Sequence, residues 1–312
     1  MEKAIQVTNL KKYFSDVKAV DDISFEVEKG ELFGFLGVNG AGKSTTINML
    51  CTLFKPTDGS AQVCGYELGK EDMEIRKSIG VVYQNNCLDD LLTVKENLMI
   101  RGALYEKNSA VIKRNVSNVC EVLSLGEVFN RPYAKLSGGQ KRRCEIARAL
   151  INAPEILFMD EPTTGLDPAT RKSVWKSIAE LRKELNMTVF LTTHYMEEAA
   201  RASHIAIIDN GKIREYGTPF SLKEEFAADK LKLIPSKRTE LVEILCNRKI
   251  AYREKEETLV IQLKNTMESL ELLNMTEPYI SGFEVVQGSM DDVFLTVTGK
   301  ALLEETNHET NL

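Results

Sequence analysis

The chain has 312 residues, 43% of them hydrophobic, and a formal net charge of −6 at pH 7. This length and composition fit a globular protein with one large domain and a smaller one. With this modest negative charge, nothing in the bulk electrostatics suggests that the protein binds nucleic acid or an anionic membrane surface.

The sequence also limits the place where the protein works. No apolar run approaches the roughly 20 residues that a bilayer-spanning helix needs, and the N-terminal stretch lacks the apolar core of a signal peptide. Six cysteines are scattered without a CxxC pair, which argues against a zinc site and fits reduced thiols. If the chain serves a membrane, we expect a peripheral subunit.

The first elements predicted are two antiparallel strands at Ala4–Thr8 and Ile23–Glu28, where apolar and polar residues alternate. Tyr13 and Phe14 lie between them in what we expect to be a polar loop. An aromatic ring there could stack on a purine base or pack on the core, and the pattern leaves both open.

A glycine-rich stretch follows, in which Gly37 precedes Gly42, Lys43 and Ser44 with the spacing GxxxxGK[ST]. The apolar run before it predicts a buried strand, and Ser44–Phe54 has helical spacing. Strand, glycine loop and helix therefore occur in the order of a phosphate-binding loop. The residues expected to hold a nucleotide's phosphates are Gly37, Asn39, Gly40, Ala41, Gly42, Lys43, Ser44 and Thr45.

The residue types suit this chemistry. Glycines let backbone N–H groups approach an anion closely, and the helix N-terminus directs its free amides at the same point. Lys43 can reach the β- and γ-phosphates, and the Ser44 hydroxyl can bind Mg²⁺. The structural alternative is a glycine turn before a helix with an incidental lysine.

The middle of the chain predicts strands at Ser60–Val63 and Ile79–Tyr83, the second ending at Gln84. Asn85–Ala153 has mostly helical spacing, and we interpret residues 87–153 as a helical subdomain inserted into an α/β core. Within it, Ser137, Gly138, Gly139 and Gln140 open a helix. Free amides there would make a second phosphate-binding helix terminus, although an ordinary helix cap has the same pattern. The basic run Lys141–Arg143 is more typical of a solvated face than of a nucleic-acid patch.

Two acidic residues follow the apolar strand Ile156–Met159, where ligands bind in open α/β sheets. Asp160 could hold Mg²⁺ and Glu161 could act as a general base on the attacking water. The alternative is a pair that caps a helix, and the preceding phosphate loop favours the catalytic interpretation.

Three further polar residues stand at the ends of predicted elements. Gln84 and His194 each follow a strand and could bond to the γ-phosphate or its attacking water, although each residue taken alone is more often structural. Asp167 precedes Pro168 and is more typical of a helix N-cap than of a catalytic group.

The remaining elements alternate between helix and strand, which predicts an α/β fold with a mostly parallel sheet over residues 1–220. Beyond Pro219 the order βαββαβ predicts a small ferredoxin-like α+β domain over residues 221–300. Ser289 is expected to cap a last helix, and residues 301–312 to form a flexible tail.

Taken together, the motifs GVNGAGKST, LSGGQ, ILFMDE, TGLD and TTH, with Gln84, resemble those of the ATP-binding cassette ATPases. The resemblance covers about residues 4–220 and implies a P-loop NTPase core with an antiparallel β subdomain. The wording DEPTTGLDPATR and SMDDVFLTVTGK further resembles the daunorubicin-resistance type of export ATPase, including its small C-terminal domain.

This resemblance implies a role for each motif. Lys43 and Ser44 match the phosphate-loop pair, and Glu161 the catalytic carboxylate. Two cassettes would face each other head to tail, so that ATP joins them as a homodimer. The remaining implied roles are the Mg²⁺ aspartate for Asp160, the Q-loop with its share in catalysis and Mg²⁺ binding for Gln84, the switch histidine for His194, the D-loop for Asp167, adenine stacking for Phe14, and contact with the γ-phosphate of the opposite cassette for Ser137–Gln140.

The resemblance departs from its pattern at Ser15, where many relatives have glycine, and so leaves open whether Tyr13 or Phe14 meets the base. It implies an ATPase that powers export of a drug, lipid or similar substrate through a separate ABC-2-type permease at the cytoplasmic face of the membrane. The alternative is a soluble cassette ATPase of translation or chromosome maintenance. One cassette per chain, with no room for a long coiled coil before Leu136, speaks against that alternative.

Overall fold

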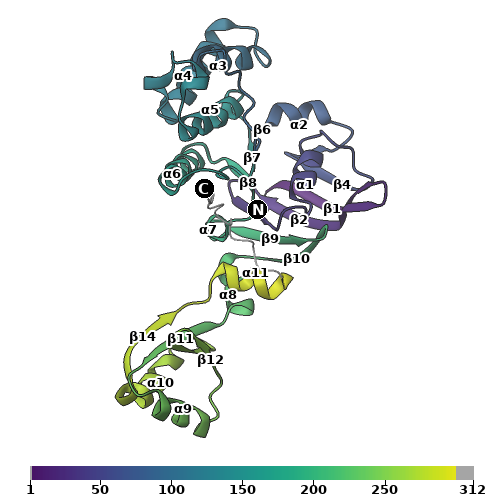
Figure 1. Cartoon of the computed structure of the whole chain (residues 1–312). Helices are drawn as coiled ribbons and strands as arrows, with labels where there is room; N and C mark the ends of the chain where they lie inside the picture. The colour runs from purple at the N-terminus through teal and green to yellow at the C-terminus, as the bar shows by residue number, and fades with distance from the viewer. Residues whose placement is uncertain (1, 300–312) are drawn as a thin grey trace, which may run out of the picture. The chain divides into compact units, whose positions relative to one another are not determined.

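The computed structural model describes residues 2–299, and the chain divides into two compact units, the first ending at Tyr216 and the second beginning at Gly217 (Figure 1). The expected tail at 301–312 lies outside the described residues. Among residues 2–299, no helix combines the length and the apolar character needed to cross a bilayer.

An antiparallel sheet of strand order β2-β1-β4-β5 begins the first unit. It comprises β1 (Lys3–Phe14), β2 (Val17–Glu28), β4 (Asp58–Val63) and β5 (Tyr66–Glu67). β1 and β2 are longer than predicted, so Tyr13 and Phe14 lie in a strand and the prediction of a loop there was wrong. Several register shifts between β1 and β2 break the simple alternation that the sequence pattern requires, and so hid the outer half of the hairpin.

The central sheet has the strand order β10-β9-β3-β8-β7-β6, and its β3–β8, β3–β9, β6–β7 and β7–β8 pairs are parallel. This confirms the predicted α/β fold with a mostly parallel sheet. Its strands are β3 (Leu32–Leu36), β6 (Ile79–Val82), β7 (Ile156–Asp160), β8 (Thr188–Thr193), β9 (His204–Asp209) and β10 (Lys212–Gly217).

Helix α1 (Lys43–Leu50) follows the glycine loop and contacts β2 of one sheet and β7 of the other. It ends earlier than the predicted Phe54, because Thr52 adopts a left-handed conformation with φ of 63° that stops the helix. One hydrophobic core joins the two sheets through α1. Its centre is a group of closely packed rings from Phe25, Phe33, Phe35, Phe158 and Phe190.

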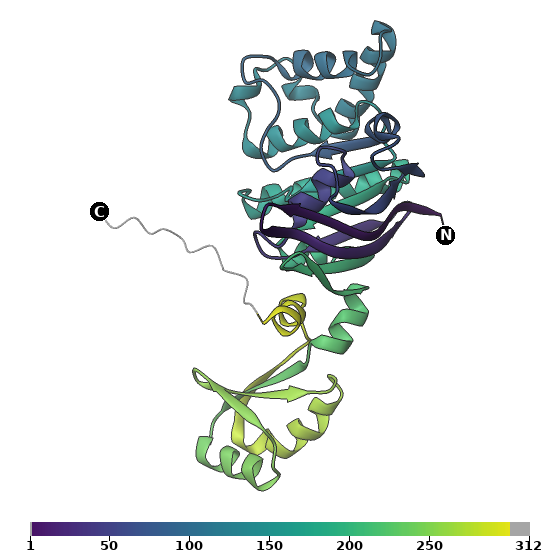
Figure 2. The ribbon, with the colours of Figure 1, turned by 90° about the vertical axis from the view of Figure 1, so that its right-hand side faces the viewer.

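The predicted inserted helices are present and gather at one end of the first unit, away from the β1–β2 hairpin (Figure 2). They are α3 (Val94–Ala103), α4 (Ser109–Val122) and α5 (Gly138–Leu150), with 3₁₀ turns η1 (Gly126–Val128) and η2 (Tyr133–Lys135). The sequence did not predict α2 (Asp72–Ser78), because only Ile75 of this short helix is buried and no apolar period results. The sheet is further covered by α6 (Pro168–Leu185) and α7 (Met196–Ala199).

The second unit contains the predicted βαββαβ order, with an antiparallel sheet of strand order β12-β13-β11-β14. Leucines from its strands and from α9 form a separate core. The six elements are β11 (Asp229–Pro235), α9 (Arg238–Asn247), β12 (Tyr252–Lys255), β13 (Thr258–Leu263), α10 (Glu268–Thr276), which leads into η3 (Glu277–Tyr279), and β14 (Ile280–Val286).

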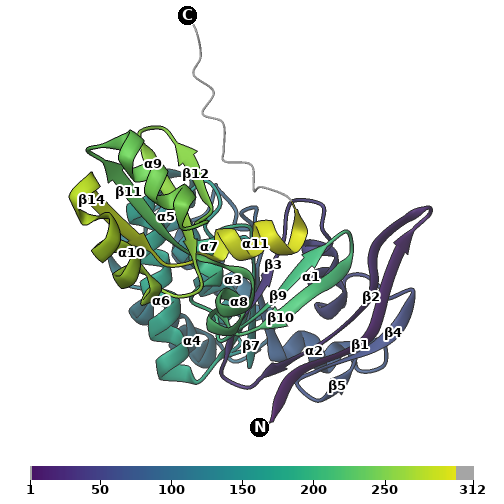
Figure 3. The ribbon, with the colours of Figure 1, turned by 90° about the horizontal axis from the view of Figure 1, so that it is seen from below.

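Two more helices of the second unit pack against each other (Figure 3). As predicted, Ser289 caps α11 (Met290–Thr298) by accepting a hydrogen bond from the Asp292 N–H. Its neighbour α8 (Pro219–Phe226) was not predicted, although Thr218 and Pro219 supply an N-cap and a first-turn proline.

The aromatic core makes a direct prediction for stability. Phe190→Ala removes a fully buried ring from the middle of the central sheet, and the cavity left behind should lower the free energy of unfolding by about 3–5 kcal/mol. Urea unfolding followed by circular dichroism measures this change. Ile100→Ala, at a side chain that is 57% exposed, should change it by about 0.5 kcal/mol or less. Equal effects of the two variants would contradict the assigned core.

Candidate nucleotide site

The parallel sheet brings distant motifs to one edge. β3, β8 and β7 are neighbours, and Gly37, His194 and Glu161 directly follow their carboxyl ends. Because parallel strands all end at the same side of a sheet, three segments far apart in sequence meet there. This is the edge at which the sequence predicted a ligand.

The glycine loop approaches its neighbours so closely that side chains are excluded. A Cβ on Gly37 would lie 2.5 Å from the Ile208 carbonyl oxygen, and one on Gly42 would lie 2.5 Å from the Ala19 carbonyl oxygen. Gly42 also has a φ of 111° and caps α1 without a side-chain hydrogen bond. The first amides of α1 therefore remain available for an anion.

Lys43 is almost fully buried at the start of α1, with 4% of its surface exposed. Its ammonium group donates hydrogen bonds to the carbonyl oxygens of Gly37 at 2.8 Å and Val38 at 3.1 Å, and lies 3.2 Å from Glu161 Oε1. Burial lowers the pKa of Lys43, and the carboxylate of Glu161 opposes that shift. A positive charge is thus held in place by groups that phosphate oxygens could replace.

Glu161 combines an unusual backbone with a strongly acidic carboxyl group. Its φ is 46°, in the left-handed region, and its N–H donates to the Thr192 carbonyl oxygen at 3.1 Å. His194 Nδ1 lies 3.3 Å from Glu161 Oε2. Interaction with His194 and the charge of Lys43 lower the pKa of Glu161 to about 2, against the effect of burial. A backbone strained by about 1–3 kcal/mol at such a residue is typical of functional sites.

Two oxygen donors suited to Mg²⁺ lie side by side. Ser44 Oγ is 3.3 Å from Asp160 Oδ1, and the Thr192 hydroxyl donates to the same carboxylate oxygen at 2.5 Å. Mg²⁺ in nucleotide sites is bound by few protein oxygens together with phosphates and water. Ser44 and Asp160 supply such oxygens, and the pair fits an ion shared with a phosphate.

A cavity of about 480 Å³ opens over the glycine loop. The sequence missed its wall from the β1–β2 hairpin and the β9–β10 turn, because only tertiary contact brings these segments here. The residues predicted for the site that line this cavity are Asn39, Gly40, Gly42, Lys43, Ser44, Thr45, Gln84 and Glu161, and the others are Val17, Lys18, Ala19, Asn210 and Gly211.

The LSGGQ stretch at residues 136–140, here called the signature segment, lies outside this cavity, as does Asp167, among the residues that the structure describes. Ser137 caps α5 in a reciprocal pair with Gln140, and Asp167 caps α6 by accepting from the Ala169 and Thr170 N–H groups. A Cβ on Gly139 would lie 2.5 Å from Thr170 Cγ2, so the signature lies against the start of α6. Both segments are thus ordered in one chain without reaching the phosphate loop.

The aromatic pair is also placed away from the cavity lining. Tyr13 donates its hydroxyl hydrogen to Asp21 at 2.6 Å, while the 42% exposed ring of Phe14 packs edge-on against Phe54. The hairpin presents Val17–Ala19 to the cavity instead. Adenine stacking by Phe14 stays a prediction.

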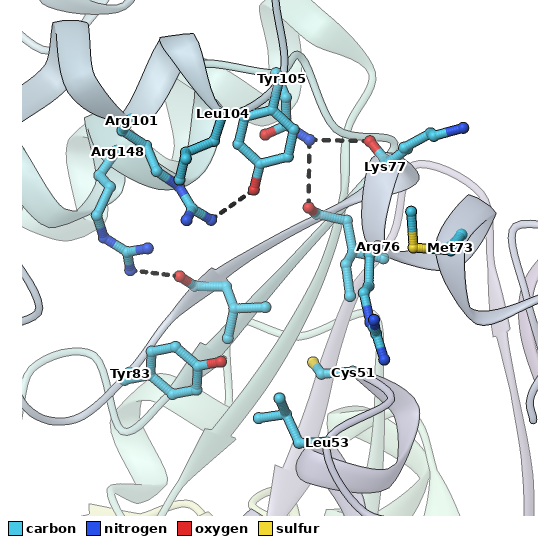
Figure 4. Close-up of a pocket in the computed structure, with 13 residues that line it drawn as sticks. Cys51, Leu53, Met73, Arg76, Lys77, Tyr83, Arg101, Leu104, Tyr105 and Arg148 are labelled. Carbon is cyan, nitrogen blue, oxygen red and sulfur yellow. Dashed lines mark hydrogen bonds between the residues drawn. The ribbon is translucent and has the colours of Figure 1, made fainter.

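A second cavity, of about 620 Å³, lies between the sheet and the inserted helices (Figure 4). Exposed apolar side chains of Leu53, Met73 and Leu104 line it together with Arg76 and Arg101. Tyr83, directly before Gln84, lies in its wall. We call this cavity the cationic groove.

Comparison with known proteins shows which family has these motifs. Residues 20–164 match the ABC transporter family model. A daunorubicin/doxorubicin resistance ATP-binding protein of Streptomyces peucetius is 34% identical over 317 residues, which cover 98% of this chain and 96% of the relative. The chain belongs to the ABC transporter ATP-binding proteins. It is accordingly a nucleotide-binding ATPase.

Another relative and two solved structures support the assignment of this ABC transporter ATP-binding protein to its family. A Nod factor export ATP-binding protein of Ralstonia nicotianae is 35% identical and covers 96% of this chain and 94% of the relative. The structure of cbiO1 from Clostridium perfringens has a TM-score of 0.67 at 26% identity, covering 79% of this chain and 96% of that one. A dimeric post-hydrolysis cassette bound to ADP and Pi has a TM-score of 0.62 at 27% identity, covering 69% and 98%.

The position of Lys43 makes a prediction about binding. Lys43→Ala should weaken ATP binding to this ABC transporter ATP-binding protein at least about tenfold, because hydrogen bonds from a charged group to phosphate are lost. Titration calorimetry measures the affinity. Lys113→Ala, on the exposed surface of α4, should leave it unchanged. Unaltered affinity in the Lys43 variant would remove the phosphate-loop assignment.

Proposed function

We propose that this ATPase powers export through a separate ABC-2-type permease at the cytoplasmic face of the membrane, and that its substrate is a drug, lipid or similar molecule. Two relatives named for drug resistance and for Nod factor export match it over nearly the whole chain, second unit included, and this observation carries the proposal. The absence of a membrane-spanning helix among residues 2–299 is consistent with a separate permease.

The chemistry follows from an exchange of partners at Lys43. Entering phosphates take over its hydrogen bonds, and the ammonium group moves its interaction from Glu161 to the γ-phosphate. Losing this positive neighbour raises the pKa of Glu161 from its low value toward the ordinary range, which makes the carboxylate a better base for the attacking water. His194 holds Glu161 in orientation, and Gln84 completes the wall around the water.

Mg²⁺ would be held by Ser44, Asp160 and Gln84, and it would neutralise charge on the β- and γ-phosphate oxygens. Thr192 orients the carboxylate of Asp160 for that task through its short hydrogen bond. Sequence analysis did not assign a role to Thr192.

We further propose that two chains complete each other's sites as a homodimer. Ser137, Gly138 and Gly139 lie outside the chain's own cavity, yet Ser137 begins a helix whose free amides suit an anion. A second copy facing head to tail would place these amides, and Asp167, on the γ-phosphate. A solved cassette of this fold, 27% identical to this chain, is dimeric, which supports the arrangement.

The cationic groove is the proposed docking place of the permease. It combines exposed apolar side chains with arginines and lies directly beside Tyr83 and the loop that carries Gln84. A short permease segment seated there would sense movement of that loop. The alternative, a soluble ATPase of translation or chromosome maintenance, is not favoured by relatives that are named for resistance and export.

The assigned base gives a test. Glu161→Gln should leave ATP binding intact, lower the rate of hydrolysis at least about 100-fold, and accumulate an ATP-held dimer, since the amide cannot accept the proton. Phosphate release and sedimentation velocity measure these effects. Glu180→Gln, at an exposed residue of α6, serves as the matched control and should behave as wild type. If turnover survives in the Glu161 variant, another group is the base.

The groove gives a second test. Leu104→Glu places a charge at the apolar rim, and it should abolish capture of an integral membrane protein from detergent-solubilised membranes of the producing cell. Basal ATP hydrolysis should persist, because Leu104 does not touch the nucleotide cavity. Met267→Glu, at an equally exposed apolar residue of the second unit, should leave capture intact. Undiminished capture by the Leu104 variant would rule the groove out as the docking place.

A further inference from the structure

The loop that carries Gln84 is held from both sides by one helix. Gln84, Asn85 and Asn86 are exposed, and their side chains offer the loop little anchorage of its own. The backbone on either side of them is bound by buried charged side chains of α5. Sequence spacing gives no hint of this, because the partners are about 60 positions apart.

Two side chains of α5 make these contacts. Arg142 Nη1 donates to the Tyr83 carbonyl oxygen at 2.6 Å, just before Gln84. Glu145 Oε1 accepts hydrogen bonds from the N–H groups of Cys87 at 2.6 Å and Leu88 at 3.0 Å, just after it. The predicted solvated face of the basic run was therefore wrong at Arg142, which is buried.

A third contact closes the network. Arg148 Nε donates a hydrogen bond to Glu145 Oε2 at 2.8 Å, and Arg148 Nη2 donates to the Val81 carbonyl oxygen in β6 at 2.7 Å. Figure 4 shows Arg148 reaching from α5 toward this strand, beside Tyr83. The Tyr133 hydroxyl group donates a hydrogen bond to Glu145 Oε1 at 3.3 Å. Of the side chains named in this network, Glu145 is the one that bonds both to the loop and to another member.

The network is rigid for a physical reason. Glu145 is fully buried, and Arg142 and Arg148 are about as buried as Lys43. Separating the loop from α5 would take two hydrogen-bond donors from the buried Glu145 carboxylate and the Tyr83 carbonyl from Arg142, although Arg148 would stay paired with Glu145 within α5. This cost favours movement of the loop and the helix as one body. The N-terminus of that same helix is the signature residue Ser137.

We propose that Glu145 is a positioning residue that joins the Gln84 loop to the signature helix α5. Contact between Gln84 and phosphate in one site then sets the orientation in which Ser137 faces the site of the opposite chain. This inference rests on the proposed function, because it requires two chains that share their sites. Glu145 touches no nucleotide and acts only through the loop and the helix.

The test is a double-mutant cycle on ATP hydrolysis by the purified chain. Glu145→Gln preserves shape but removes the negative charge, and its single amide oxygen cannot accept from both the loop N–H groups and Arg148, so the link between loop and helix is weakened. We expect at least a tenfold lower kcat with a KM for ATP within about threefold of wild type. In a Gln84→Ala background the same substitution should change kcat less than twofold, because the group through which it acts is gone.

A matched control separates positioning from simple loss of stability. Val116→Ala empties space in the core of the inserted helices, where the side chain is 1% exposed. It should lower the melting temperature at least as much as Glu145→Gln does, yet leave kcat of the folded protein unchanged. As a second readout, Glu145→Gln added to Glu161→Gln should weaken ATP-dependent dimerisation at least tenfold in sedimentation velocity.

Each outcome decides. If the double variant loses kcat by the product of the two single fold-changes, Glu145 does not act through the loop. If kcat of Glu145→Gln is as high as that of Val116→Ala, the positioning role is wrong. A wild-type chain that splits no ATP would refute the proposed function instead. That result is distinct, because it is measured before any variant.

Discussion

A triphosphate carries several negative charges that must be surrounded by donors, and we propose that one chain surrounds only part of it. The glycine loop, Lys43 and the start of α1 face one cavity, whereas the signature amides lie outside it. The parallel sheet fixes this division, because β3, β7 and β8 bring their ends together while α5 begins in the inserted helices. The proposed dimer and the coupling through Glu145 both follow from that incomplete site.

Charge is kept in balance before the nucleotide arrives. Lys43 Nζ and Glu161 Oε1 lie 3.2 Å apart. Burying either charge without the other would cost a large free energy of desolvation. Interaction with His194 and the charge of Lys43 hold the pKa of Glu161 at about 2, against the effect of burial. In the proposed mechanism, a phosphate that takes Lys43 therefore also leaves Glu161 a stronger base. Under this proposal, binding and activation are thus two consequences of one exchange of partners.

Local patterns predicted much of this molecule and tertiary contacts decided the rest. The conformation of the glycine loop before α1, the strand ending at Asp160 and the capped last helix depend on neighbours in sequence, so their motifs were sufficient to predict them. Thr192 and Arg142 could not be assigned, because their partners lie on other elements. Register shifts hid the outer β1–β2 hairpin, and one buried residue was too few to reveal α2.

The most direct test of the shared site is the ATPase rate per chain measured over a wide range of protein concentration. If each site needs a second copy, the specific activity should fall steeply on dilution below the dissociation constant of the dimer, and added ATP-loaded Glu161→Gln chain should partly restore it. A specific activity that stays constant at every dilution would show that one chain completes its own site, and would contradict the account.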